Sequence, residues 1–315
     1  MTLMFLLGID LGVHVLPWTS PTVVSLLVLS FLTIGLFYWS EKNAKYPLIP
    51  LRLFHNLSNV ASLVVNFTQA FVYMAAEYYL PLYLQSAKEA SPTRSGLLIF
   101  PLTLVQALAA ITSGTLIHRT GEYCFILYAG MLLVTIGNGL YITLQSDTST
   151  SMIIGMEILA GIGIGLTFAP PLISIHANVP EKDVSTATST FGYIHNLSTA
   201  MATVIGSAVI QAGMGTQAAR LEAVGLPLQL IEAFVGRKAT SNVEMIREVG
   251  DVGQKAAVKD AFTSSLRNLW ILCTILSAIG LLATALISRR RLPRSEQAPE
   301  TAGNEPSEAS RAGEQ

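Results

Sequence analysis

The sequence predicts an all-α protein that crosses a membrane about seven or eight times. Hydrophobic residues make up 51% of the 315 residues and charged residues only 12%, whereas soluble domains carry roughly 25% charged residues. The apolar residues gather in stretches of about 20, which is the length that spans a bilayer, and the charges lie between these stretches. Both cysteines fall inside apolar stretches, so neither a disulfide framework nor a metal site is indicated.

Each long apolar stretch is predicted to form one membrane helix, because a helix satisfies its own backbone hydrogen bonds in lipid. The stretches are Val23 to Trp39, Val60 to Leu84, Gly96 to Ile117, Cys124 to Leu144, Met152 to Ile175, Ala187 to Ile210 and Leu269 to Ile287. A further candidate, Met1 to Leu16, is short and contains Asp10 and His14. It lacks the basic region of a signal peptide, so we expect the chain to begin partway through a membrane segment.

The stretches divide the chain into six predicted parts. These are linker spans (1–39, the first one incomplete), a cytoplasmic loop (40–59), five spans (60–212), a long extracytoplasmic loop (213–265), a last span (266–288) and a disordered cytoplasmic tail (289–315). The orientation follows from Lys and Arg in the short loops and at the start of the tail. The tail is rich in Glu, Ser, Ala and Gly, a composition typical of disorder.

The long 213–265 loop contains two amphipathic patterns, at 218–234 and 243–266. Their apolar residues recur at approximate helical spacing. They fit either interfacial helices that lie on the membrane or solvated loop helices, and the sequence does not choose between these alternatives.

A line of polar side chains runs along the span 60–84. Ser62, Asn66, Gln69, Tyr73 and Glu77 are spaced so that they share one helix face. Such groups are costly in lipid, so this face should meet protein or a water-filled cavity. We favour the wall of a substrate pathway, with Glu77 as a proton-coupling candidate. The alternative is hydrogen bonding between helices.

The span 152–175 holds a second proton-coupling candidate, Glu157, which alternatively extends to the membrane interface. The run Gly161-Ile162-Gly163-Ile164-Gly165 lies within a membrane helix rather than between a strand and a helix, so close helix packing is favoured over nucleotide binding. Pro170-Pro171 should break or kink the same helix.

A weaker polar stripe of Thr186, Ser189, Thr190 and Tyr193 marks the span 187–210. Thr190 and Tyr193 are therefore candidates for substrate binding. His195 lies on nearly the opposite side of that helix, and we interpret it as a hydrogen-bonded structural histidine rather than a group that titrates near neutral pH.

Three segments resemble one transporter family. They are Gly114-Thr115-Leu116-Ile117-His118-Arg119-Thr120-Gly121, Pro50-Leu51-Arg52-Leu53-Phe54 and Ser185 to Met201. The first is similar to the loop motif of the major facilitator superfamily, and the others to segments of its fungal fourteen-span drug:proton antiporters. The resemblance implies a major facilitator-like carboxyl-terminal bundle plus central extra helices. It covers only the second half of that fold, so we expect a truncated chain or a missing amino-terminal half as partner.

The resemblance implies proton-coupled efflux of drugs or of fungal secondary metabolites such as mycotoxins. Asn66, Gln69, Tyr73, Thr190 and Tyr193 would contact the substrate, and Glu77 or Glu157 would exchange the proton. Gly114, Arg119 and Gly121 would form a gating loop, although His118 replaces the acidic residue of the motif, and a loop that only sets topology is the alternative. The implied partners are the lipid bilayer, a small amphipathic substrate and protons.

The alternative function is a non-transporting membrane fragment or a regulatory partner of a transporter. An enzyme is not predicted, because the sequence has no His-Glu-x-x-His, Gly-x-Ser-x-Gly or phosphate-loop motif. No cofactor or metal is expected, and a net charge of −1 gives no affinity for nucleic acid. We expect a multi-pass protein of the plasma membrane, with the vacuolar membrane as the alternative.

Overall fold

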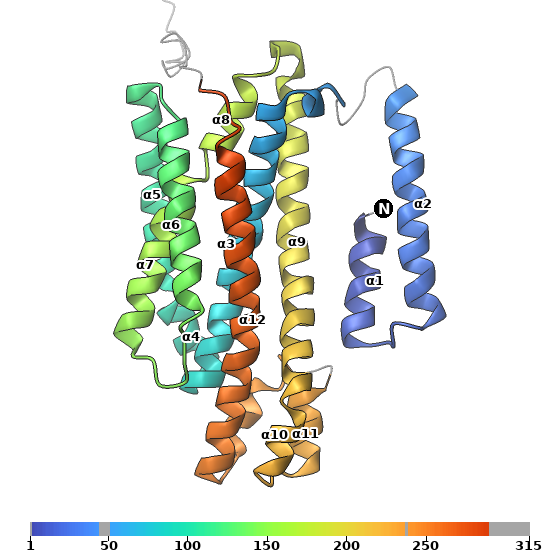
Figure 1. Cartoon of the computed structure of the whole chain (residues 1–315), viewed down its shortest axis with the longest axis vertical. Coiled ribbons are helices and arrows are strands. Elements are labelled where there is room, and N and C mark those ends of the chain that lie inside the picture. Colours follow the sequence, from blue (N-terminus) through green and yellow to red (C-terminus); the bar gives the residue numbers. More distant parts are fainter. Residues whose placement is uncertain (1, 44–50, 237–238, 290–315) are drawn as a thin grey trace, which may run out of the picture.

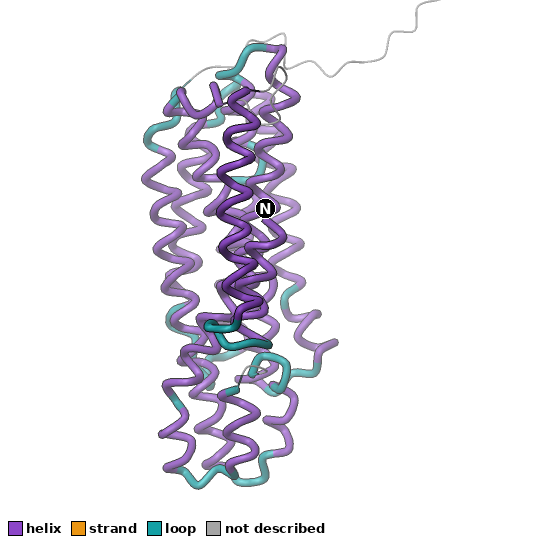
Figure 2. Tube along the Cα trace, turned by 90° about the vertical axis from the view of Figure 1, so that its right-hand side faces the viewer, coloured by secondary structure: helices purple, strands orange, loops and turns teal. Residues whose placement is uncertain are grey.

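The computed structural model describes residues 2–43, 51–236 and 239–289, and these ranges contain helices and loops but no strand (Figures 1 and 2). Six helical units form an elongated bundle. They are α3 (Leu57–Lys88), α4 with α5 (Pro92–Leu98, Phe100–Thr120), α6 (Cys124–Tyr141), α7 with α8 (Thr150–Leu166, Pro170–His176), α9 (Val184–Thr216) and α12 (Val252–Thr284). The pair α1 (Thr2–His14) and α2 (Pro21–Asn43) stands beside α9 (Figure 1).

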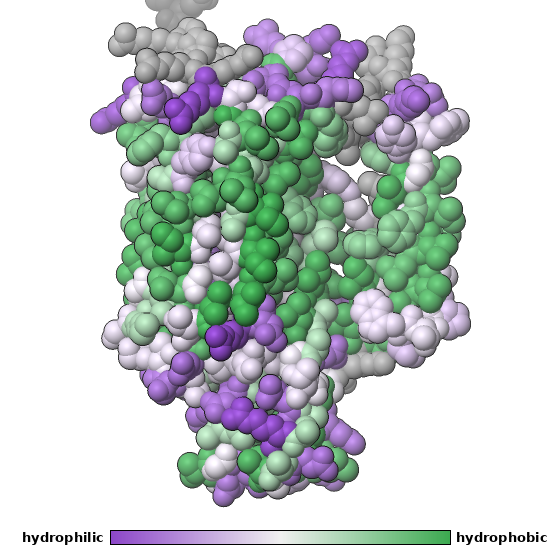
Figure 3. All heavy atoms as spheres, in the orientation of Figure 1, coloured by the Kyte–Doolittle hydropathy of each residue, from purple (hydrophilic) through white to green (hydrophobic). Residues whose placement is uncertain are grey.

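Seven helical segments of the described ranges are long and apolar enough to cross a membrane, which confirms the predicted class. Figure 3 shows a broad hydrophobic belt around the middle of the visible face, with hydrophilic residues at both ends. Large apolar side chains of the membrane-crossing helices are exposed, among them Leu108, Ile111, Phe125 and Leu282. Apolar side chains at these positions suit contact with lipid rather than water.

The helix ends follow local capping rules. The Asn56 side chain accepts a hydrogen bond from the backbone N–H of Ser58 at the start of α3, and Ser149 caps α7 in the same way. Gly121 ends α5 in the left-handed conformation, at φ 71°, which glycine adopts without steric cost. The predicted break at Pro170-Pro171 is confirmed, since α7 ends at Leu166 and α8 begins at Pro170.

The segment predicted as the 213–265 loop is mostly helical. After α9 come α10 (Ala218–Ala223), α11 (Leu228–Val235) and the 3-10 helix η3 (Val243–Glu248). The described residues of 217–251 form a lobe that projects beyond one end of the bundle (Figures 1 and 2). The pattern at 243–266 does not form a separate helix, because α12 starts at Val252 and continues into the last span.

Burial explains why the short helices pack together as a lobe and why the 243–266 pattern does not form a separate helix. Leu221, Phe234 and Ile246 of the lobe are completely buried, as is Phe262 of α12. The Phe234 and Phe262 rings meet edge to face, with centroids 6.0 Å apart. The apolar faces of the short helices therefore pack on α12 and on one another rather than on a membrane surface, and the interpretation as interfacial helices does not fit.

The remaining loops are short. The 3-10 helices η1 (Leu51–His55) and η2 (Glu181–Asp183) precede α3 and α9 at the end of the bundle opposite the lobe. Helices α2 and α3 both extend into the segment predicted as the 40–59 loop. Apart from Arg289, the predicted disordered tail lies outside the described residues.

Helix α7 lies very close to both of its neighbours. A Cβ atom at Gly161 would sit 2.7 Å from the Leu102 carbonyl oxygen of α5, and one at Gly163 would sit 2.6 Å from the Val134 nitrogen of α6. The predicted packing role of the glycine run is thus confirmed. Because of this close contact, the preceding turn of α7, which carries Glu157, also lies deep among the other helices.

Candidate functional site

The first half of the α3 polar stripe joins α3 to α8 and α9. The Ser62 hydroxyl donates to Ser174 Oγ of α8 at 2.9 Å. The Asn66 Nδ2 donates to the Phe191 carbonyl of α9 at 2.9 Å, and its Oδ1 lies 3.2 Å from His195 Nδ1. The stripe therefore faces protein rather than lipid. In this half it makes the bonds between helices that were the alternative interpretation, and His195 is hydrogen-bonded as predicted.

The second half of the stripe is less constrained. Gln69 is buried and makes no hydrogen bond to another described residue. Tyr73 and Glu77 are half-buried, and the Tyr73 hydroxyl interacts with the Glu77 carboxylate and with the Gln106 amide of α5. These groups combine hydrogen-bonding capacity with partial access, which suits contact with a small molecule.

The candidates on α9 have different surroundings. Thr190 is buried, and its hydroxyl donates to the Thr186 carbonyl of the same helix at 2.9 Å. Tyr193 is half-buried. Tyr193 therefore retains access to a ligand, whereas the Thr190 hydroxyl is already used within its helix.

Glu157 is the most isolated polar group in the bundle. Its side chain is 0% exposed, and neither carboxylate oxygen has a hydrogen-bond partner. Extension to the membrane interface, the alternative for this residue, is excluded by that burial. An ionised carboxylate in such surroundings is strongly disfavoured unless a donor or a cation reaches it.

Two aromatic residues with unpaired polar atoms belong to the same region, and sequence reasoning missed both. Tyr141 of α6 is fully buried with an unpaired hydroxyl, and it interacts electrostatically with Glu157. Trp270 of α12 has an unpaired Nε1, and its ring lies against Tyr141 with centroids 5.1 Å apart. Asn138 Oδ1, one turn from Tyr141, is also unpaired. No sequence motif marks these residues, because each is a single polar group in an apolar span.

The predicted gating loop lies at the end of the bundle opposite the lobe. Gly121 provides the tight turn, and its N–H donates to the Ile117 carbonyl at 2.8 Å. A Cβ at Gly114 would meet no atom of the described residues within 4 Å. Arg119 is exposed and makes no hydrogen bond or ion pair within the described part of the chain. Of the three residues, Gly121 alone has a visible local role.

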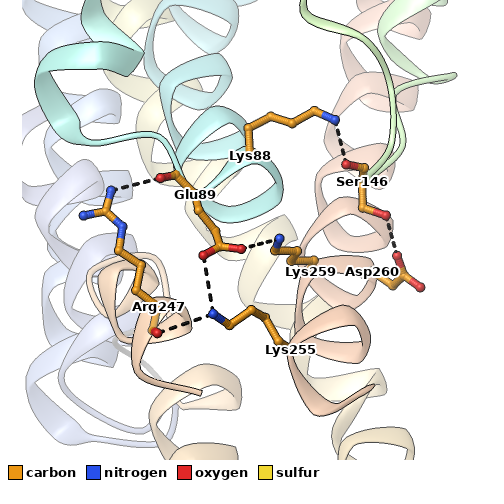
Figure 4. A network of polar contacts seen from close by, with 7 residues as sticks. All are labelled: Lys88, Glu89, Ser146, Arg247, Lys255, Lys259 and Asp260. Carbon is orange, nitrogen blue, oxygen red and sulfur yellow. Dashed lines mark hydrogen bonds and ion pairs between the residues drawn. The ribbon is translucent and has the colours of Figure 1, made fainter. Parts of the chain in front are cut away.

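A charged cluster at the other end of the bundle was also missed. We call it the Glu89 network, and its members are Lys88, Glu89, Ser146, Arg247, Lys255, Lys259 and Asp260 (Figure 4). The Glu89 carboxylate lies 2.5 Å from Lys259 Nζ and 3.5 Å from Lys255 Nζ. The hydrogen bond from Lys259, assisted by the positive charges of both lysines, holds the pKa of Glu89 below its ordinary value.

The Glu89 network connects four parts of the chain. The Arg247 guanidinium of η3 donates to the Glu89 carbonyl at 3.2 Å. Lys88 donates to the Ser146 carbonyl at 2.7 Å, and the Ser146 hydroxyl donates to Asp260 of α12 at 2.9 Å. The end of α3, the α6–α7 loop, the lobe and α12 are thereby joined at one point.

Comparisons with known proteins agree with this architecture. The family model for the Major Facilitator Superfamily matches residues 1–203. Efflux pump dotC of Dothistroma septosporum is 34% identical over 300 residues, which are 95% of this chain and 51% of that protein. The MFS-type transporter ppz2 of Metarhizium majus is 32% identical over 289 residues (91% and 50%), and efflux pump FUS6 of Gibberella fujikuroi is 30% identical over 257 residues (81% and 46%).

The chain spans about half the length of these curated relatives. The family model nevertheless covers well over half of the chain and includes α3 to α8 and part of α9. Taken with the seven helices that can cross a membrane, this match shows that the chain belongs to the major facilitator superfamily of membrane transporters.

Proposed function

We propose that this chain supplies the carboxyl-terminal bundle of a proton-coupled exporter of small amphipathic molecules. The observation that carries the proposal is Glu157, a completely buried carboxyl group without a partner for either oxygen. Intramembrane acids of this kind are retained at a cost in stability, which makes a role in proton movement the default hypothesis. The names of the efflux-pump relatives support export as the direction.

The two protonation states of Glu157 would favour different conformations of the bundle. The neutral acid is compatible with apolar burial, whereas the carboxylate requires donors or water. A proton that binds and leaves can therefore shift the balance between two conformations, provided that they differ in what they offer to the carboxylate. Glu77, the other candidate, is half-buried and already interacts with Tyr73, so we assign the proton to Glu157.

Substrate contact is assigned to the less constrained half of the α3 stripe. Gln69 and Tyr73 would contact the molecule directly, with Tyr193 of α9 as a further contact. Asn66 would act by holding α3 against α9, and Thr190 would pack beside it. Transporters of this type enclose the substrate between two related halves, so an amino-terminal half would complete the site. The expected membrane is the plasma membrane, with the vacuolar membrane as the alternative.

The test is dye accumulation in a yeast host that lacks its own efflux pumps. The chain is expressed alone and fused to the amino-terminal half of the dotC pump. We expect one of these forms to lower the accumulation of an amphipathic dye, and a protonophore to abolish the effect. Glu157→Gln should remove the proton-dependent part of export, because the amide cannot exchange a proton, while Glu181→Gln, on the exposed helix η2, should leave it intact.

Two results would contradict the proposal. One is unchanged proton-dependent export by Glu157→Gln at equal protein abundance. The other is the absence of any effect on accumulation with either form, combined with altered transport by an intact efflux pump that is co-expressed in the same host. That combination would favour the regulatory partner instead.

A further inference from the structure

Two buried donors without partners match the two unpaired oxygens of Glu157 in number. Glu157 presents two buried acceptor oxygens, and Tyr141 and Trp270 each present one polar hydrogen on an atom without a partner. All three side chains are at most 1% exposed. Buried donors and acceptors are almost always paired in folded proteins, so these three groups, together with the unpaired Asn138 Oδ1 of α6, require an explanation.

The packing of α6 on α7 places Tyr141 beside Glu157. Close approaches at Gly130 with Thr167, Val134 with Gly163 and Gly137 with Ala160 fix an antiparallel register between the two helices. Continuing that register by one turn brings Tyr141 opposite Met156, the neighbour of Glu157. The electrostatic interaction between Tyr141 and Glu157 agrees with this placement.

Trp270 brings α12 to the same place. Its ring is tilted by 51° against the Tyr141 ring, with 5.1 Å between the centroids. A side chain that only filled space here would not need a polar nitrogen, and Phe or Leu would avoid the cost of burying it. The three groups come from three helices that pack on one another through α6.

We propose that Tyr141 and Trp270 are positioning residues that donate hydrogen bonds to Glu157 when Glu157 is ionised. Glu157 releases its proton to the aqueous phase, and the carboxylate then accepts hydrogen bonds from the Tyr141 O–H and the Trp270 Nε1–H. No covalent bond changes in either donor. The structure shows the unpaired arrangement, which suits the neutral acid, and a shift of α6 and α12 relative to α7 would form the paired one.

The helices around α7 carry a few other ionisable groups in the described part of the chain. On α5, His118 and Arg119 lie at the end opposite the lobe, and so do Cys124 and Tyr128 near the start of α6. On α12, Arg267 is exposed, whereas the Cys273 thiol, one turn from Trp270, is completely buried. The inference rests on the proposed function only in assigning the exchanged proton to Glu157.

Infrared difference spectroscopy of the purified chain in lipid nanodiscs tests the inference. The C=O stretch of protonated Glu157 is assigned as the band that Glu157→Gln removes, and it is followed through a pH titration. Tyr141→Phe should raise the proton affinity of Glu157 about tenfold or more, which is ~1.4 kcal/mol, because the ionised form loses a charge-assisted hydrogen bond. Trp270→Phe keeps the ring contact and should act in the same direction.

The matched control is Tyr79→Phe. Tyr79 is also fully buried, but its hydroxyl donates to the Thr203 carbonyl of α9, so its loss should leave the Glu157 titration unchanged. Folding of each variant is checked by its melting temperature. An unchanged titration in a folded Tyr141→Phe or Trp270→Phe variant overturns the assignment of that donor, and unchanged titrations in both overturn the inference.

The outcome does not depend on transport. A coupled titration, together with proton-dependent export that Glu157→Gln leaves unchanged, would support the donor pairing and contradict the proposed function. If export requires Glu157 but its titration is unchanged in both donor variants, the proposed function is supported and the donor pairing is contradicted.

Discussion

At the scale of single residues, the bundle depends on glycines, because their lack of a side chain lets neighbouring helices approach closely. Gly161 and Gly163 face backbone atoms of different neighbouring helices. Backbone atoms cannot rotate away, so an added methyl group must separate the helices. This contact also positions Glu157, which lies one turn from Gly161 on the same helix. Packing and the proposed proton chemistry are thereby linked.

Gly161→Ala should destabilise the chain by about 1–3 kcal/mol, the usual cost of overpacking. The new Cβ would lie 2.7 Å from the Leu102 carbonyl oxygen, and relief requires α5 to move. Gly155→Ala is the matched control on the same helix, because its Cβ would meet no atom within 4 Å. Thermal unfolding in detergent compares the two variants. Equal melting temperatures would mean that α5 and α7 are not held at this contact.

The sequence allowed a correct prediction of which face of α3 is polar, but not of which residues on that face have partners. Spacing fixes the angular position of Asn66, Gln69 and Glu77 on their own helix. The partners of Asn66 come from α9, more than 120 residues later. For the same reason Tyr141 and Trp270 went unnoticed: the register of α6 and α12 on α7 depends on packing across the bundle.

At the scale of elements, the end of α3 is unusual because it is formed by Glu89 rather than glycine. Glu89 has φ 51°, the single positive φ of a non-glycine residue in the described ranges. Glycine or asparagine is normally favoured at this cap. The carboxylate provides a reason for the exception, because it binds Lys255 and Lys259 of α12. Glu89 therefore ends α3 and at the same time helps to hold the lobe end of α12 against it.

Glu89→Gln should lower the melting temperature at neutral pH, by an amount that reflects about 1 kcal/mol or less for a partly exposed ion pair. The folded pKa of Glu89 is below its unfolded value, which is about 4.3. Its contribution to stability is therefore complete above that value and is lost as the pH falls through the lowered folded pKa. The difference in melting temperature between the chain and Glu89→Gln should shrink accordingly in acid.

The exposed Glu244 of η3, which makes no ion pair within the described residues, provides the control. Glu244→Gln should change the melting temperature little at any pH. A pH-independent effect of Glu89→Gln would assign the loss to the cap geometry rather than to the ion pairs.

The lobe was the element least accessible to sequence reasoning. Its helices are short, and α11 has only eight residues, too few to be stable alone in water. They form because Leu221, Phe234 and Ile246 are buried against the extension of α12 and one another. That burial requires α12 to continue past the membrane boundary, which hydropathy does not reveal. The long apolar spans, in contrast, could be predicted because length and composition alone define them.

At the scale of the whole molecule, the bundle has two chemically distinct ends. One end carries the lobe with the Glu89 network, and the other carries Gly121, η1 and η2. Basic residues of the short loops and the tail favour the second end as cytoplasmic. The lobe would then face the exterior or the vacuolar lumen. This orientation decides from which side a proton reaches Glu157, so it bears directly on the proposed export.

Cysteine labelling in intact cells measures the orientation. Both native cysteines are buried, with exposures of 9% and 0%, so an introduced cysteine dominates the signal. Val252→Cys lies at the lobe on a side chain that is 83% exposed, and Glu181→Cys lies on η2 at the opposite end. A membrane-impermeant maleimide should label Val252→Cys in intact cells expressing the plasma-membrane form, and Glu181→Cys only after permeabilisation.

The reverse pattern would place the Glu89 network in the cytoplasm. Lysines near a cytoplasmic leaflet would then face anionic lipid, which attracts basic residues by about 1 kcal/mol each. Lys255 and Lys259 share the single Glu89 carboxylate within the chain, so their attraction to lipid would be weaker than that of two free lysines. The orientation therefore rests on the basic residues of the short loops and the tail, and the labelling pattern tests it directly.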